Sequence, residues 1–155
     1  MSNIFKITCI VIIITMTTFS ASVADENVTI GLLTPLTGPY RLDAEYQRNF
    51  ALLAAAEINA GGGVMGRPVK VIVEDTQLKP GIGSEKAGML IQKGVKYLTG
   101  GVSSNVVSVV SKIAHQSDVL HFGIGGSNSL TGKNCNRHHF NLGPAAYQMA
   151  TGTGS

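Results

Sequence analysis

Four short runs rich in β-branched and apolar residues alternate with longer segments of helical periodicity, and this alternation limits the possible folds most strongly. The runs are Val28–Thr34, Val69–Asp75, Val95–Thr99 and Asp118–Phe122. Each is separated from the next by enough residues for a helical crossover, the connection that parallel strands need. The pattern therefore predicts an α/β fold, with an open parallel sheet and helices on both faces.

The segments between these runs carry the start and stop signals of helices. Asp43 is the expected N-cap of the first helix, and glycines at 61–63 end it. Its apolar residues recur three or four positions apart, which places them on one helical face; they are Tyr46, Phe50, Leu53, Ala54 and Ile58.

Two further helices and a final extended segment follow the same logic. Pro80 opens the second helix, and either Ser103 or Ser104 caps the third. The expected inner positions of these two helices are Ala87, Leu90, Ile91, Val107, Val110 and Ala114. Beyond them, Asn136–Leu142 reads as extended, and another helix is predicted to begin near Ala145.

Three loops that leave the carboxyl ends of the predicted strands are rich in turn-forming and small polar residues. They are Pro35–Tyr40, Gly100–Ser104 and Gly123–Ser129. Ligands of open α/β sheets bind beyond these strand ends, at the point where the strand order reverses. This rim is therefore the predicted functional edge.

The rim residues suggest how a small zwitterion could be bound. Ser103 and Ser104 stand at a helix start, where free backbone N–H groups suit a carboxylate, although simple capping explains a serine there equally well. Gly125–Ser127 could offer carbonyl groups and a hydroxyl to an ammonium, and Tyr40 could offer a ring face to an apolar side chain. Taken alone, a plain strand-to-helix turn and ordinary packing explain these residues more simply.

The N-terminus has the three parts of a secretory signal. Lys6 precedes an apolar stretch at 7–17, and Ser22-Val-Ala24 provides small residues for cleavage. A membrane anchor is the alternative, but it needs about 20 apolar residues and this stretch is shorter. We therefore predict a cleaved signal peptide at residues 1–24 and a periplasmic location. Cys9 would leave with the signal, so Cys135 would be free or paired with a partner outside this sequence.

Several functional classes lack their motifs. The net charge of +3 comes from scattered residues without a basic run, which argues against nucleic-acid binding. His115 and Asp118 have no nucleophile elbow nearby and read as a surface pair, while His138 and His139 would point to opposite faces of a strand. The glycines of 61–66 follow a helix, the wrong context for a dinucleotide loop. The sequence predicts no catalysis, no cofactor and no metal.

Several segments in order resemble the type I periplasmic binding proteins of the leucine/isoleucine/valine-binding kind. They are Ile30–Pro39, Glu57–Pro68, Val71–Asp75, and the stretch from Leu130 through Cys135 to Phe140. The resemblance implies the N-terminal lobe of a two-lobed protein, incomplete here. Residues 25–142 would form this lobe, and residues 143–155 would begin the crossover to a second lobe.

The resemblance also implies a function. Proteins of this kind bind branched-chain amino acids or related small amides and deliver them to an ABC permease in the inner membrane and its ATPase. The ligand carboxylate would lie on Ser104 and Ser103, its ammonium on Gly125, Gly126 and Ser127, and its side chain against Tyr40. The same lobes also occur in the sensing domains of signalling receptors, which remain the alternative function.

Overall fold

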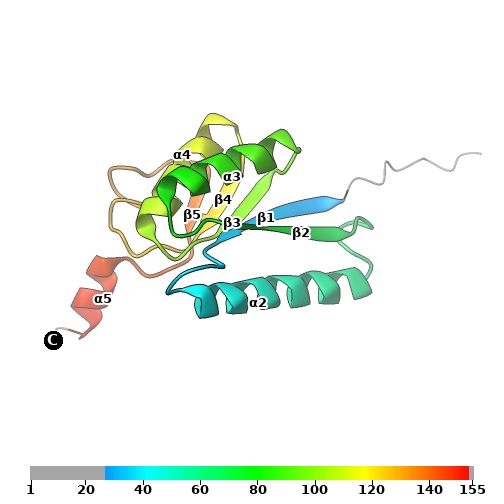
Figure 1. Ribbon diagram of the computed structural model, residues 1–155, viewed down its shortest axis with the longest axis horizontal. Helices are drawn as coiled ribbons and strands as arrows, with labels where there is room; N and C mark the ends of the chain where they lie inside the picture. The colour runs from blue at the N-terminus through cyan, green and yellow to red at the C-terminus, as the bar shows by residue number, and fades with distance from the viewer. Residues whose placement is uncertain (1–26, 154–155) are drawn as a thin grey trace, which may run out of the picture.

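The computed structural model describes residues 27–153, so the predicted signal peptide at 1–24 lies outside the described residues. The chain alternates strands and helices until the fourth strand and then adds a fifth strand and a last helix (Figure 1). The elements are β1 (Val28–Thr34), α2 (Arg41–Ala60), β2 (Val69–Asp75), α3 (Pro80–Gln92), β3 (Tyr97–Gly100), α4 (Ser104–Gln116), β4 (Leu120–Gly123), β5 (His139–Asn141) and α5 (Ala146–Thr153).

The five strands form one parallel sheet in the order β2-β1-β3-β4-β5. β1 and β2 pair along their whole length, from Val28 beside Val69 to Thr34 beside Asp75. The chain first adds β2 on one side of β1 and then returns to add β3, β4 and β5 on the other. The strand order therefore reverses between β1 and β3, which creates a crevice at the carboxyl edge.

Helices cover both faces of the sheet, as the sequence predicts. Figure 1 shows α2 on one face, and α3 and α4 side by side on the other. The buried core fills the space between the sheet and the α3–α4 layer; its members are Leu33, Ala87, Leu90, Val95, Leu98, Val106, Val110, Ala114 and Val119. This packing holds the start of α4 at the carboxyl edge of the sheet.

Helix α2 forms where predicted, but two expectations about it are wrong. Tyr40 is the N-cap, and Asp43 lies inside the first turn. The buried positions are the small residues Ala44 and Ala55, whereas four of the predicted apolar residues are exposed by 53%, 68%, 56% and 42%: Tyr46, Phe50, Leu53 and Ile58. Small side chains let the helix approach β1 and β2 closely, and the large apolar residues lie outside that contact.

The remaining element boundaries differ from the sequence predictions by one or two residues. β3 and β4 each start two residues later than predicted and end one residue later, at Gly100 and Gly123. Ser103 is the N-cap of α4, yet its side chain makes no capping hydrogen bond. The extended segment contains a short strand, β5, which pairs in parallel with β4.

Within residues 27–153, no helix has both the length and the apolar character needed to cross a membrane. The thiol of Cys135 is exposed and forms no disulfide there.

Candidate functional site

The loops after β3 and β4 meet at the carboxyl edge of the sheet. The N–H of Ile124 donates to the carbonyl of Gly100 (3.1 Å), which continues the β3–β4 pairing past the last strand residues. Gly101 lies directly against this segment, with a positive φ of 116°. The structure thus brings two of the three predicted rim loops into contact.

Ser104 links the start of α4 to the loop after β4. Its Oγ accepts a hydrogen bond from the backbone N–H of Ser127, at 3.0 Å. Because this oxygen accepts from the protein, its own proton remains available to donate to a ligand. The first backbone N–H groups of α4 have no partner within the helix and point outward from its start. The side chain of Ser103 does not cap them. The arrangement suits a carboxylate.

Asn141, the last residue of β5, forms hydrogen bonds with both the backbone N–H and the backbone carbonyl of Gly125. The N–H of Gly125 donates to Oδ1 of Asn141 (3.2 Å), and Nδ2 donates to the carbonyls of Gly125 (2.9 Å) and Gly143 (2.7 Å). A Cβ on Gly125 would lie 2.5 Å from Cδ1 of Leu130, so a side chain at this position has no room. Asn141 therefore fixes the loop that contains the predicted ammonium site.

The groups predicted to hold an ammonium already have protein partners. The carbonyl of Gly126 accepts from the N–H of Ala146 at the start of α5 (2.7 Å). The hydroxyl of Ser127 lies 2.8 Å from that of Ser129. Each carbonyl keeps a second lone pair, so a further hydrogen bond to a ligand remains possible.

Tyr40 is not joined by a hydrogen bond to the residues around Ser104 and Ser127. It ends the loop after β1, and its side chain is 44% exposed. Its backbone carbonyl accepts from the N–H of Ala44, while its side chain makes no hydrogen bond among residues 27–153. The structure places it at the rim without joining it to Ser104 or Ser127.

Sequence reasoning missed two side chains that shape the crevice between β1 and β3. Gln47 accepts from the hydroxyl of Thr34 (3.1 Å) and donates to the carbonyl of Gly101 (3.0 Å), so it bridges the ends of both strands. Asp75 accepts from the N–H of Leu36 (2.9 Å) and the hydroxyl of Thr37 (2.8 Å). The position of Asp75 at a strand's carboxyl end was a usable signal, whereas Gln47 gave none.

The environment of Asp75 favours its charged form. Burial by itself would raise the pKa of this carboxyl, but hydrogen bonds from Gln77, Thr37 and Leu36 outweigh burial and lower the pKa below its ordinary value. The carboxylate therefore stays ionised and keeps the loop after β1 in place at neutral pH.

The histidines form separate pairs. His138 contacts His115, and His139 contacts His121, so the two adjacent residues have different partners. Asp118 does not pair with the side chain of His115; it contacts Arg137 and His138 instead. Across residues 27–153, no three metal-ligating side chains gather in a way that could hold an ion.

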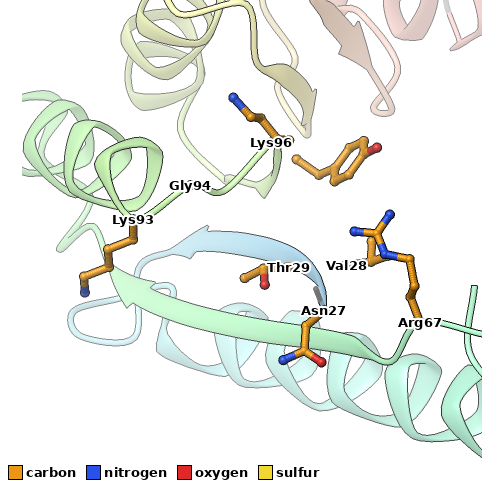
Figure 2. A pocket seen from close by; sticks show the side chains of 8 residues that line it. Asn27, Val28, Thr29, Arg67, Lys93, Gly94 and Lys96 are labelled. Carbon is orange, nitrogen blue, oxygen red and sulfur yellow. The ribbon is translucent and has the colours of Figure 1, made fainter. Parts of the chain in front are cut away.

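A cavity of about 510 Å³ lies at the opposite, amino edge of the sheet. Figure 2 shows Arg67 and Lys96 on two sides of it, on the segments that lead into β2 and β3. Its lining is Asn27, Val28, Thr29, Arg67, Lys93, Gly94, Lys96 and Tyr97. None of the predicted site residues contributes to this cavity, and the strand-order reversal favours the other edge, so we place the candidate site at the carboxyl edge.

Comparisons with known proteins indicate the family and the fold. Residues 27–155 match a family model described as "Periplasmic binding protein". The Leu/Ile/Val-binding protein BraC3 of Rhizobium johnstonii is 34% identical over 100 residues, which are 64% of this chain and 27% of that protein. The leucine-, isoleucine-, valine-, threonine- and alanine-binding protein of Pseudomonas aeruginosa is 32% identical over 101 residues, 65% of this chain and 27% of that protein.

A solved structure has a similar fold. A periplasmic binding protein from Burkholderia mallei superposes with a TM-score of 0.76 and 27% identity, covering 83% of this chain and 34% of the other. The chain thus spans about a quarter to a third of the length of the relatives that it matches.

Proposed function

Because this chain belongs to the periplasmic binding protein family, we propose that it forms the N-terminal lobe of an extracytoplasmic solute-binding protein that supplies an amino acid to an ABC importer. In this proposal, residues 1–24 are a cleaved signal peptide and residues 25–142 form the lobe. Residues 143–155 begin the crossover to a second lobe. The protein binds its solute without catalysis, and an inner-membrane permease receives it.

The observation that carries the proposal is the position of Ser104. It lies at the start of α4, at the carboxyl edge, with its Oγ fixed by the N–H of Ser127. A hydroxyl fixed in this way, beside the N–H groups of a helix start, can bind the carboxylate of an α-amino acid. Relatives whose names state that they bind leucine, isoleucine and valine support an amino acid as the ligand.

The other ligand contacts follow from this anchor. The carboxylate lies against Ser104 and the N-terminus of α4 next to Ser103. The ammonium is held by the free lone pairs of the Gly125 and Gly126 carbonyls, together with Ser127. Tyr40, exposed at the end of the loop after β1, packs against the ligand's side chain.

We predict that Ser104→Ala weakens binding of L-leucine to the natural full-length protein by roughly 10- to 100-fold. The reason is that a hydrogen bond to a charged group contributes about 1.5–3 kcal/mol. Isothermal titration calorimetry measures the change directly.

Two variants make this test specific. Ser117→Ala removes a hydroxyl at the C-cap of the same helix and should leave the affinity unchanged. Ser104→Thr keeps a hydroxyl and should recover much of the affinity. Equal affinities for wild type and Ser104→Ala would show that the carboxylate is bound elsewhere.

A further inference from the structure

All four histidines of the chain take part in two contacts that hold the β5 segment against the rest of the lobe. Nδ1 of His138 lies 2.8 Å from Nδ1 of His115 on α4. Nδ1 of His139 lies 3.1 Å from Nδ1 of His121 on β4. In each pair one imidazole must donate a proton and the other must accept it, so at least one Nδ1 in each pair carries no proton.

In the pair formed by His121 and His139, the first ring is buried and the second is half-buried. His121 is only 1% exposed, and both rings lie close to Gly123 beneath Val107 of α4. Burial, with a smaller contribution from the neighbouring His139, lowers the pKa of His121 to about 3. Burial also lowers the pKa of His139. Both rings are therefore neutral while β5 stays in place.

The pair formed by His115 and His138 lies at the edge of the same segment, among charged groups. Nε2 of His138 is 3.5 Å from a carboxylate oxygen of Asp118, which also faces Arg137. Lys112 and Cys135 line the surface hollow that contains His115.

The β5 segment also holds the candidate site in place. Asn141 forms hydrogen bonds with the backbone N–H and carbonyl of Gly125. The N–H of Leu142 donates to the carbonyl of Gly123 (2.8 Å). The N–H of His121 in turn donates to the carbonyl of His138 (2.7 Å). If β5 leaves the sheet, the loop that contains Gly125 loses these contacts.

We propose that the pair formed by His121 and His139 is a pH-sensitive latch, which holds β5 on the sheet at neutral pH and releases it in acid. The released segment takes His139 into water, where it binds a proton near its ordinary pKa. On the basis of the proposed function, release of β5 also lowers the affinity for the ligand, because the Gly125 loop is no longer fixed.

The direction of the effect follows from proton linkage. His121 and His139 have lowered pKa values when β5 is attached, because the fold buries them. Release of β5 exposes His139 to water, so in the proposed detached state its pKa returns toward the ordinary value. The attached state is therefore favoured above about pH 6.5 and loses stability as the pH falls below it. For each histidine kept neutral by attachment, the ratio of detached to attached β5 should rise about tenfold between pH 7.5 and 5.5.

Hydrogen–deuterium exchange with mass spectrometry on the full-length protein tests the latch without any ligand. Exchange is measured at pH 7.5 and 5.5 and corrected for the intrinsic pH dependence of amide chemistry. The protection of residues 138–146 is expected to fall by tenfold or more at pH 5.5. The β1–β2 pairing, which contains no histidine, should keep its protection.

Two variants supply the control. In the double variant H121N/H139N, asparagines can hydrogen-bond to each other without titrating, so the pH dependence of protection at 138–146 should shrink. The single variant His139→Asn removes only the ring that leaves with β5, and it gives a second test if the double variant does not fold. Equal loss of protection in wild type and both variants would overturn the proposal. So would pH-independent protection in the wild type, or loss of protection across the whole lobe at the same pH.

Discussion

Replacing Gly101 by alanine is expected to lower the free energy of unfolding by about 4 kcal/mol, the combined cost of backbone strain and overpacking. Gly101 has a φ of 116°, which residues with a side chain rarely adopt. Its added Cβ would also overlap Cγ2 of Val107 and lie 3.3 Å from the carbonyl oxygen of Ile124. Urea denaturation followed by circular dichroism measures the change, since the chain has no tryptophan to report by fluorescence.

Gly38 offers a matched control for this prediction. It too has a positive φ, of 89°, but a Cβ there would meet no atom within 4 Å. Gly38→Ala should therefore cost only the backbone strain, about 1–2 kcal/mol. Similar losses for the two variants would mean that the packing around Gly101 relaxes easily, and that the contact between the β3 and β4 loops is not rigid.

The order of strands and helices could be predicted because it depends on local patterns. Val28–Thr34 and Val69–Asp75 are strands with the predicted bounds, and Pro80 starts a helix as expected. Runs of β-branched residues and helix-stop glycines act over a few residues, so they are readable without knowledge of tertiary contacts. The prediction of a candidate functional edge followed from topology, since parallel strands place all their carboxyl ends together.

The orientation of α2 could not be predicted in the same way. Its spacing shows which residues share a helical face, but it does not show which face meets the sheet. Phe50 is 68% exposed, while Ala44 is fully buried. The choice depends on how closely the helix approaches β1 and β2, which is a property of the assembled fold.

The side chains that hold the candidate site together also could not be predicted from the sequence. Gln47 reaches Gly101 across 54 positions in the chain, and Asn141 reaches Gly125 across 16. Contacts between residues so far apart in the chain produce no periodic or local pattern in the sequence. Ser104 and Gly125–Ser127 were proposed from the sequence because small residues after strands are a recognisable pattern, whereas the side chains that fix them in place could not be proposed in this way.

Asn141→Leu is expected to lower the free energy of unfolding by about 3 kcal/mol and to weaken binding of L-leucine to the full-length protein. Leucine has a similar volume but provides no hydrogen bonds, so the N–H and carbonyl of buried Gly125 and the carbonyl of Gly143 lose their partner. A buried polar group left unpaired costs about 1–3 kcal/mol. Urea denaturation and calorimetry measure the two effects.

Asn49→Leu is the matched control, because Asn49 is exposed on α2 and its side chain accepts only a long bond from the adjacent Arg48. This variant should change neither stability nor affinity by more than about 0.5 kcal/mol. The two readouts for Asn141→Leu then separate two roles. Lower stability with unchanged affinity would mean that Asn141 only completes the fold. A loss of affinity under conditions where the variant remains folded means that it also positions the loop that contains Gly125.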